Sequence, residues 1–417
     1  MTTVRLDGGV SRTDLPNGLV VVTETIPGLR SAAVGFWMRT ASAHETAERM
    51  GVSHLLEHMV FKGTARRSAQ DIALALESRG GALDAYTGRD STAFQARVLD
   101  TDLPLAFDVL DDLVRSPLLR DDDLARERQV VIEEIATVED TPDDLVFDLH
   151  ANHLFPQHSY GFRILGTRET VGALGVEHLK ELHGGKYRPG HTVVAAAGRV
   201  EHDWLLESLR EAGWFDMEPG PTPSRVTPPA RVGRGLSRIP RDGSQVHLVF
   251  GAETFKYGDP RRHSLTLITT ILGGGMSSRL FQKVREDLGL AYTVYAFHSF
   301  MQASGLVGVY VGTQPPTARR AYEVISEELR RLSRDSLTAI ELASAKQQVK
   351  GQIVLALEGS LARMYRIAGQ ALNNEPYRSI DAVLADVDAV TADQVAATAA
   401  EFFDPERQAV VWLGPDT

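Results

Sequence analysis

Two histidines and a glutamate stand close together in the segment SHLLEHMVFKG, residues 53–63. His54 and His58 are four residues apart, so on a helix both imidazoles would lie on one face and could hold one metal ion. Glu57 directly precedes the second histidine and could take a proton from a water molecule at that ion. The HxxEH pattern also occurs by chance, so these three residues alone leave an ordinary amphipathic helix as the alternative.

A third metal ligand has to be His, Asp or Glu, because the chain contains no cysteine. The pattern predicts a helix over 121–138 whose apolar stripe includes Leu124 and Val131. Glu127 follows Leu124 by three residues, which puts its carboxylate on the apolar side of the helix. Glu134 follows Val131 by the same interval. A buried carboxylate without a partner is costly, so this placement counts against the solvated glutamates that are usual on a surface helix.

The elements that would position these residues occur twice in the chain. Segments of the first half recur in the second half at shifts of 216 to 218 residues: 188–198 with 404–414, 123–135 with 341–353, and 104–114 with 320–330. Such self-similarity indicates a duplicated domain.

Each half begins with an alternating apolar run, 31–42 in the first and 244–255 in the second, which predicts a strand. Helical patterns follow in both halves. We therefore predict an α+β fold of two tandem homologous domains, each an antiparallel sheet with helices packed on it. Five prolines in 217–231 predict a linker. The expected domains are an N-terminal catalytic repeat, 1–216, that carries the metal site, and a C-terminal degenerate repeat, 232–417, that contributes to substrate binding.

The duplication provides a control for the metal-site residues. By the flanking glycines, HLLEHMVFKG corresponds to SLTLITTILG, residues 264–273, which keeps the helical pattern but has no histidine or glutamate. Glu127 and Glu134 correspond to Ala345 and Gln352. The same scaffold is expected to fold without these groups. Their joint presence in the first half therefore favours a functional site over a packing role.

Composition narrows the class of protein. With 417 residues, 43% of them hydrophobic and 24% charged, the chain has the composition of a globular protein of at least two domains. The formal net charge of −11 argues against non-specific binding to nucleic acid. No apolar run reaches the roughly 18 residues of a membrane span, and the polar start shows no secretory signal. We expect a cytoplasmic protein with no nucleic-acid or membrane partner.

The spacing of these groups resembles that of a known family. His54-x-x-Glu57-His58, followed by Glu134 76 residues after His58, is similar to the inverted zinc-binding motif of the pitrilysin-type (M16) metallopeptidases, the inverzincins. The resemblance extends over essentially the whole chain, including its duplication. A chain of two repeats resembles the short branch, which includes the mitochondrial processing peptidase β subunit and bacterial relatives.

The resemblance implies a role for each of these residues. His54, His58 and Glu134 would hold one zinc ion per chain, with a water molecule completing the site. Glu57 would take the proton of that water and pass it to the leaving amine. Glu127 would orient a ligand from behind. The implied reaction is hydrolysis of a peptide bond without a covalent intermediate.

The resemblance also points to residues that would bind the substrate. The segment GGALDAYTGRDSTAF resembles the family's edge strand, which takes a peptide as an added β-strand and would here use Ala82, Leu83, Asp84 and Ala85. The family usually has Asn where this chain has Asp84, and an aspartate cannot donate the amide hydrogen bond.

Two further pairs match the family in sequence. Arg285 and Tyr292, seven residues apart, resemble the pair that contacts the substrate backbone and stabilises the transition state. Without the resemblance, Arg285 would be expected to pair with a carboxylate and Tyr292 to lie in the core. Asp144 and Asp148 match an acidic pair that binds an arginine upstream of the cut, although two acids on a helix surface are usually only solvated.

These inferences favour a zinc endopeptidase that acts on extended or unfolded peptides. The family architecture implies two chains facing each other, with a homodimer as the simplest arrangement and a heterodimer with a zinc-less homologue as the alternative. A second hypothesis is a non-catalytic subunit of the same fold that binds peptides or assembles with a partner chain. A third is a different zinc hydrolase with the same ligands. No motif identified above specifies the natural substrate, the cleavage preference, or the movement by which the two chains would open and close.

Overall fold

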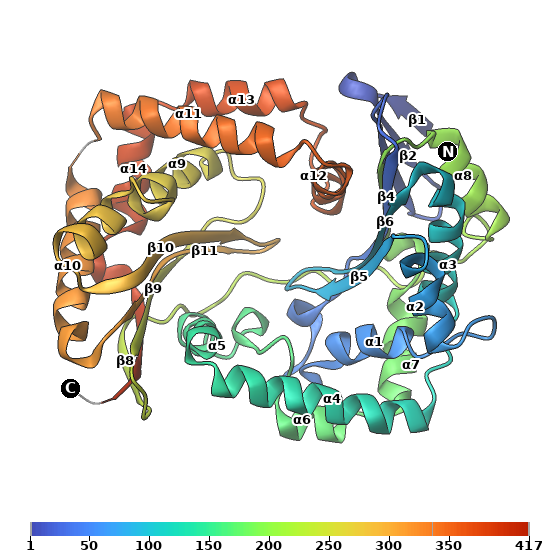
Figure 1. The fold of residues 1–417 in the computed structure, drawn as a ribbon, viewed down its shortest axis with the longest axis horizontal. Helices are drawn as coiled ribbons and strands as arrows, with labels where there is room; N and C mark the ends of the chain where they lie inside the picture. Colours follow the sequence, from blue (N-terminus) through green and yellow to red (C-terminus); the bar gives the residue numbers. More distant parts are fainter. Residues whose placement is uncertain (1, 336, 416–417) are drawn as a thin grey trace. The chain divides into compact units, whose positions relative to one another are not determined.

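A computed structural model describes residues 2–335 and 337–415 of the chain (Figure 1). It contains two compact units, and neither is continuous in sequence. The first unit comprises the residues up to Ile135, Arg163–Arg225 and Leu355–Ser379. The second unit comprises Ala136–Phe162, Val226–Val354 and the residues from Ile380 onward. Each unit has its own sheet and its own hydrophobic core.

The first unit is built on a seven-stranded sheet of order β1-β2-β3-β7-β4-β6-β5. β3 and β7 pair in parallel, and the other neighbours are antiparallel. The strands are β1 (Thr2–Arg5), β2 (Val10–Asp14), β3 (Val20–Thr25), β4 (Ser31–Met38), β5 (Ala82–Thr87), β6 (Thr92–Leu99) and β7 (Thr192–Gly198).

The second unit has a five-stranded sheet of order β10-β11-β9-β12-β8, in which only β8 and β12 are parallel. Read from the other edge, this is the order and direction of β3-β7-β4-β6-β5 in the first unit. The predicted α+β class and the duplication are therefore confirmed, with one parallel pair in each otherwise antiparallel sheet. The strands are β8 (Gly235–Pro240), β9 (Val246–Thr254), β10 (Ala291–Phe300), β11 (Gly305–Thr313) and β12 (Ala409–Gly414).

Helices cover the first sheet on both faces. They are α1 (Val52–Val60), α2 (Ala69–Glu77), α3 (Leu103–Arg115), α4 (Asp121–Asp140), α6 (Arg168–Ala173), α7 (Val176–Lys186), α8 (His202–Glu211) and α12 (Ser360–Leu372). In β4, Val34 and Phe36 belong to the core that α1, α3 and α4 share, whereas Ala33 and Trp37 pack with α12. Burial on both faces explains why β4 and β7 are apolar along nearly their whole length.

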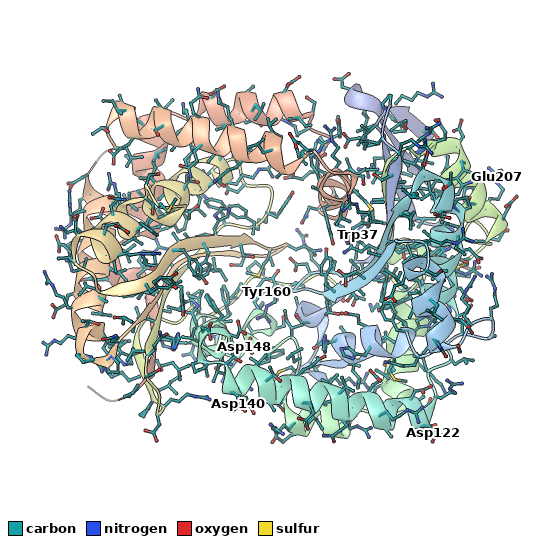
Figure 2. The ribbon with its side chains drawn as sticks, in the orientation of Figure 1. Trp37, Asp122, Asp140, Asp148, Tyr160 and Glu207 are labelled. Carbon is teal, nitrogen blue, oxygen red and sulfur yellow. The ribbon has the colours of Figure 1, made fainter. Side chains whose placement is uncertain are left out.

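The two units exchange one helix each. α12 is encoded in the second half of the chain but packs on β3, β4 and β7 of the first sheet (Figure 1). There it meets Trp37 of β4 (labelled in Figure 2), which lies edge-on to Tyr365 of α12. α5 (Pro142–Leu154) is encoded in the first half but packs on β9 and β12 of the second sheet. The expected domains, 1–216 and 232–417, assign each helix to the half that encodes it, so the compact units differ from them by this exchange.

The remaining helices belong to the second unit, and short 3₁₀ turns lie in both units. These helices are α9 (Arg262–Gly273), α10 (Pro315–Arg334), α11 (Ala339–Ala356), α13 (Ile380–Ala389) and α14 (Ala392–Phe402), and a π-helical turn, η7, covers Phe281–Asp287. Short 3₁₀ turns are η1 (Asp7–Gly9), η2 (Ser42–His44), η3 (Ala47–Arg49), η4 (Asp100–Asp102), η5 (Ser159–Gly161), η6 (Pro189–His191) and η8 (Pro405–Arg407). Within the described residues, no helix combines the length and apolarity needed to cross a membrane.

Candidate metal centre

Helix α1 carries the two histidines, and its start is fixed by the backbone around it. Gly51 precedes the helix with a φ of +91°, and a Cβ there would lie 2.6 Å from the carbonyl oxygen of Leu165, so only glycine fits. The carboxylate of Glu45 accepts hydrogen bonds of 2.8 Å from the backbone N–H groups of both Gly51 and Ser53. Glu45, which lies outside the helix, thus caps the first turn of α1, next to His54.

The apolar side of α1 determines where its polar groups lie. Leu55, Leu56, Met59 and Val60 are completely buried in the core of the first unit. His54, Glu57 and His58 occupy the remaining side of the helix and are partly exposed. These three groups are therefore accessible and yet held by a rigid, well-packed helix.

Helix α4 brings two carboxylates to the same place (Figure 2 labels Asp122 and Asp140 near its two ends). Val131 and Ile135 on its inner side are buried, and so is Glu127, at 7% exposure. Glu134 is partly exposed. The prediction that Glu127 lies on the apolar side of the helix is confirmed, whereas the side chain of Glu134 is 39% exposed.

His54, His58 and Glu134 converge at one point. One ligand atom from each lies within 4.8 Å of the other two, and among the described residues no other group of three such side chains has this geometry. The Nε2 atoms of His54 and His58 lie 3.7 Å and 3.6 Å from the two carboxylate oxygens of Glu134. These separations are too long for hydrogen bonds. They are close to the roughly 3.3 Å between neighbouring donor atoms around a tetrahedral zinc ion. The donor set and its spacing therefore fit a zinc ion.

The imidazole of His54 is suited to metal binding by its surroundings. Burial, together with the nearby His58, lowers the pKa of His54 to about 4, so the ring is neutral at pH 7. A neutral imidazole offers a lone pair to a metal ion, whereas a protonated one does not. Its Nδ1 atom is buried and has no hydrogen-bond partner within the described part of the chain. Burial therefore keeps this ring ready to bind a metal ion at neutral pH.

His58 is oriented from behind by Glu127. Its Nδ1 lies 3.2 Å from Oε2 of Glu127, and Nε2 faces Glu134. The other carboxylate oxygen of Glu127, Oε1, lies 2.8 Å from the ammonium group of Lys62. A carboxylate behind a ligating imidazole fixes its tautomer and ring orientation. The geometry is that expected for the predicted orienting role of Glu127.

Glu57 is held beside this cluster by a strand. The hydroxyl of Thr87, in β5, donates a short hydrogen bond to Oε2 of Glu57. Burial raises the pKa of Glu57 above its usual value, while the Thr87 hydrogen bond and His58 oppose that rise. The negative charges of Asp84 and Glu134 also raise the pKa of Glu57, so both carboxylates lie near it. A raised pKa makes the Glu57 carboxylate a better proton acceptor than an ordinary glutamate.

Strand β5 forms one edge of the first sheet, directly beside Glu57. It follows β6 at the end of the strand order, with Ala82 opposite Arg97 and Thr87 opposite Thr92. Leu83 and Ala85 pack against the core, and Ala82 and Asp84 are exposed. The structure thus places the four predicted substrate-binding residues on an edge strand, and their role in binding stays a prediction.

Arg285 and Tyr292 contact each other in the second unit. The guanidinium of Arg285 lies 4.5 Å from the centroid of the Tyr292 ring and donates a 3.2 Å hydrogen bond to its backbone oxygen. Tyr292 is 78% exposed, so it is not a core residue, and Arg285 lies in the π-helical turn η7. An exposed tyrosine stacked on an arginine is available to a ligand.

The acidic pair Asp144 and Asp148 lies on α5, which belongs to the second unit. Burial is the main cause that raises the pKa of Tyr295, and Asp143 and Asp144 raise it further. Asp144 therefore lies near an aromatic side chain of β10. The proposed role of this pair in binding an arginine stays a prediction.

Sequence reasoning missed three residues that support the centre: Glu45, Lys62 and Thr87. Glu45 and Thr87 reach α1 from a loop and from a strand, and no helical periodicity links them to it. Lys62 lies two residues beyond the end of α1, so helical spacing gave no signal for it either.

In the second unit, buried side chains occupy the positions that correspond to the residues of the candidate metal site. Leu267 and Ile268, the counterparts of Glu57 and His58, are completely buried, and Ser264, the counterpart of His54, is 3% exposed. Ala345, the counterpart of Glu127, belongs to the same core. The expectation that the scaffold forms without the metal-site residues is confirmed.

Comparisons with known proteins relate the chain to one family. Residues 20–168 match the family model described as insulinase (peptidase family M16), and residues 173–349 match that of the peptidase M16 inactive domain. An uncharacterized zinc protease of Streptomyces coelicolor is 40% identical over 98% of this chain and 90% of its own length. One of Bacillus subtilis is 36% identical over 97% of this chain and 98% of its own.

Two solved structures share the fold. A peptidase M16 inactive domain from Pseudomonas fluorescens superimposes with a TM-score of 0.89 at 21% identity, covering 98% of each chain. A protease from Helicobacter pylori superimposes with a TM-score of 0.88 at 19% identity, covering 97% of this chain and 99% of its own. At these identities the likeness concerns the fold alone.

Proposed function

Because the chain belongs to the peptidase M16 family, we propose that it is a zinc-dependent endopeptidase that hydrolyses extended or unfolded peptides. The single observation that carries the proposal is the convergence of His54, His58 and Glu134 on one point. The names of the relatives, zinc proteases, support the same metal and the same class of reaction.

Each residue of the centre has a chemical task in this proposal. His54, His58 and Glu134 would hold the ion, which supplies Lewis acidity toward the scissile carbonyl and toward a water molecule. Glu57 takes the proton of the attacking water and delivers it to the nitrogen of the leaving amine. Thr87 holds the Glu57 carboxylate in place through its hydroxyl. No side chain has to form a covalent bond to the substrate.

The substrate would bind as an extended strand along β5. An edge strand presents unpaired backbone groups, and a peptide that adds to it places its own backbone in a defined register. Thr87 links β5 directly to Glu57, so a peptide on this edge would lie beside the proton-accepting carboxylate. We assign Arg285 and Tyr292 to contacts with the substrate backbone, and Asp144 and Asp148 to a basic side chain of the peptide.

For the assembly, we propose a homodimer, with a heterodimer containing a zinc-less homologue as the alternative. The chain carries both the zinc-binding residues and the Arg285–Tyr292 pair, so it requires no different partner to supply them. The mass in solution, measured by light scattering, distinguishes the two when the chain is expressed alone. A location in the cytoplasm stays a prediction.

The test is hydrolysis of an unstructured peptide library containing arginine by the purified chain, beside Glu57→Gln. We expect the wild type to cleave, a chelator to abolish cleavage and zinc to restore it. Glu57→Gln should bind zinc normally and cleave about 100-fold to 10,000-fold more slowly.

Two adjacent glutamates of α4 offer a matched control for the metal site. Glu134→Gln should lose zinc, whereas Glu133→Gln, at the exposed neighbouring position, should retain both zinc and activity. Zinc binding without cleavage by the wild type would favour the non-catalytic subunit. Equal activity of the wild type and Glu57→Gln would refute the proposed mechanism.

A further inference from the structure

Lys62 makes a contact that the proposed chemistry does not use. Its ammonium nitrogen lies 2.8 Å from Oε1 of Glu127, and Oε2 of the same carboxylate lies 3.2 Å from Nδ1 of His58. His58 lies in the last turn of α1, and Lys62 follows the end of the helix by two residues and reaches the same carboxylate from the turn beyond it. Lysine, glutamate and histidine thus form a chain of contacts that ends at a predicted zinc ligand.

Glu127 depends on these two contacts because it has little access to water. Its side chain is 9% exposed, and each of its oxygens faces one partner. A buried carboxylate that loses one partner can turn or shift toward solvent. Either movement would release the imidazole of His58 from its fixed orientation.

Lys62 is itself held in place. Its backbone N–H donates to the carbonyl of Met59 at 3.2 Å, and its own carbonyl accepts a 3.1 Å hydrogen bond from Arg120. Arg120 in turn is bound to Asp123 at 2.7 Å. The lysine therefore starts from a fixed backbone position, unlike a freely moving surface lysine.

The second copy of the repeat shows what replaces this pair when there is no metal site. By the alignment of HLLEHMVFKG with SLTLITTILG, Lys62 corresponds to Leu272, and Glu127 corresponds to Ala345. Leu272 and Ala345 both belong to the core of the second unit. An apolar pair serves packing at these positions, so the Lys62–Glu127 pair is present only where a histidine has to be oriented.

We propose that Lys62 is a positioning residue for the zinc site: it holds Glu127, which fixes the ring of His58 with Nε2 toward Glu134. This inference rests on the metal site of the proposed function, but it concerns metal affinity and does not require peptide hydrolysis. In this role Lys62 acts through Glu127 and needs no contact of its own with the ion or the substrate.

The test measures the zinc dissociation constant by competition with a chromogenic chelator, using metal-free protein. Lys62→Met, which keeps the length of the side chain and removes its charge, should weaken zinc binding roughly 10-fold. Lys62→Arg keeps the charge and should stay within about threefold of the wild type. Lys180→Met is the matched control, because Lys180 lies 3.6 Å from Glu177 on an exposed surface and should leave the affinity unchanged.

A double-mutant cycle separates positioning from general weakening of the structure. Glu127→Gln should weaken zinc binding, and adding Lys62→Met to it should cause no further loss, since Lys62 acts through Glu127. The thermal unfolding midpoint of the metal-free form should change little in Lys62→Met. If this variant does not fold, Lys62→Gln takes its place in the cycle.

Three outcomes among the variants would overturn the inference. These are an affinity of Lys62→Met within twofold of the wild type, full additivity of the two substitutions, or equal losses in Lys62→Met and Lys180→Met. A wild type that binds zinc but cleaves no peptide would sink the proposed function and leave this inference standing. A wild type that binds no zinc would overturn both.

Discussion

Neutralising Glu24 should loosen the exchanged helix α12 from the first sheet. Glu24, in β3, is 2% exposed, and its two carboxylate oxygens contact Arg363 at 2.5 Å and Arg366 at 3.0 Å, both from α12. Glu24→Gln keeps the size of the side chain and removes the negative charge between the two guanidinium groups. Both arginines would then lack their counter-charge in a largely buried place.

The expected loss is about 3 kcal/mol of the free energy of unfolding. Removing one member of a buried ion pair costs about 3–5 kcal/mol, and each hydrogen bond to a charged group contributes about 1.5–3 kcal/mol. The side chains of Arg363 and Arg366 are 27% and 13% exposed, so water partly replaces the lost contacts, and we take the lower end of this range.

The assay is urea unfolding followed by tryptophan fluorescence. Of the four tryptophans, Trp37, Trp204 and Trp214 lie in the first unit, and the Trp37 ring is 5.9 Å from Tyr365 of α12. Glu207→Gln is the matched control, because Glu207 forms an exposed ion pair on α8 of the same unit (labelled in Figure 2). Its loss should stay below about 0.5 kcal/mol. A loss of less than 1 kcal/mol in Glu24→Gln, or equal losses in both variants, would refute the reasoning.

Three more predictions concern single side chains. His150, 2% exposed, donates to the backbone oxygen of Ala409, and burial lowers its pKa to about 4. The unfolded chain takes up a proton below about pH 6.5 and the folded ring does not. Stability is therefore lost as pH falls through this window, and in urea unfolding the wild type should lose about 2 kcal/mol more than His150→Gln between pH 7 and pH 5. Gly251→Ala would place a Cβ 2.4 Å from the His150 ring, and the expected loss of about 1–3 kcal/mol would appear as a lower thermal midpoint, an unchanged midpoint being the contrary result. Thr87→Val removes the hydrogen bond to Glu57 and should lower kcat/KM about 10-fold on a peptide substrate, whereas Thr87→Ser should retain most of the activity; equal rates for the two variants would contradict the role of the hydroxyl.

Several features of the site could be predicted because they depend on helical periodicity. His54 and His58 share one side of α1, and Glu127 lies on the apolar side of α4, as the 3.6-residue repeat requires. The duplication could be read from matching segments. It predicted that the second copy of the domain folds without the residues of the candidate metal site. These inferences concern neighbours along the chain, for which the sequence contains the geometry.

Contacts between distant segments could not be predicted in this way. Thr87 reaches Glu57 because β5 is the edge strand beside α1, and strand order follows from the packing of the whole unit. The exchange of α5 and α12 is equally invisible in either segment, since each helix packs its apolar side on a sheet and the pattern of that side does not say which sheet it is.

The sequence by itself therefore determined the groups of the candidate metal site, their local spacing on two helices, and the fold class that carries them. Only the tertiary structure decided what surrounds those groups. These surroundings are the Thr87 hydroxyl that donates to Glu57, the Lys62 ammonium that contacts Glu127, and helix α12, which covers one face of the first sheet. The physical reason is the separation along the chain of the residues that interact. Helical spacing is set by hydrogen bonds four residues apart, whereas burial and long-range pairing depend on how all strands and helices pack together.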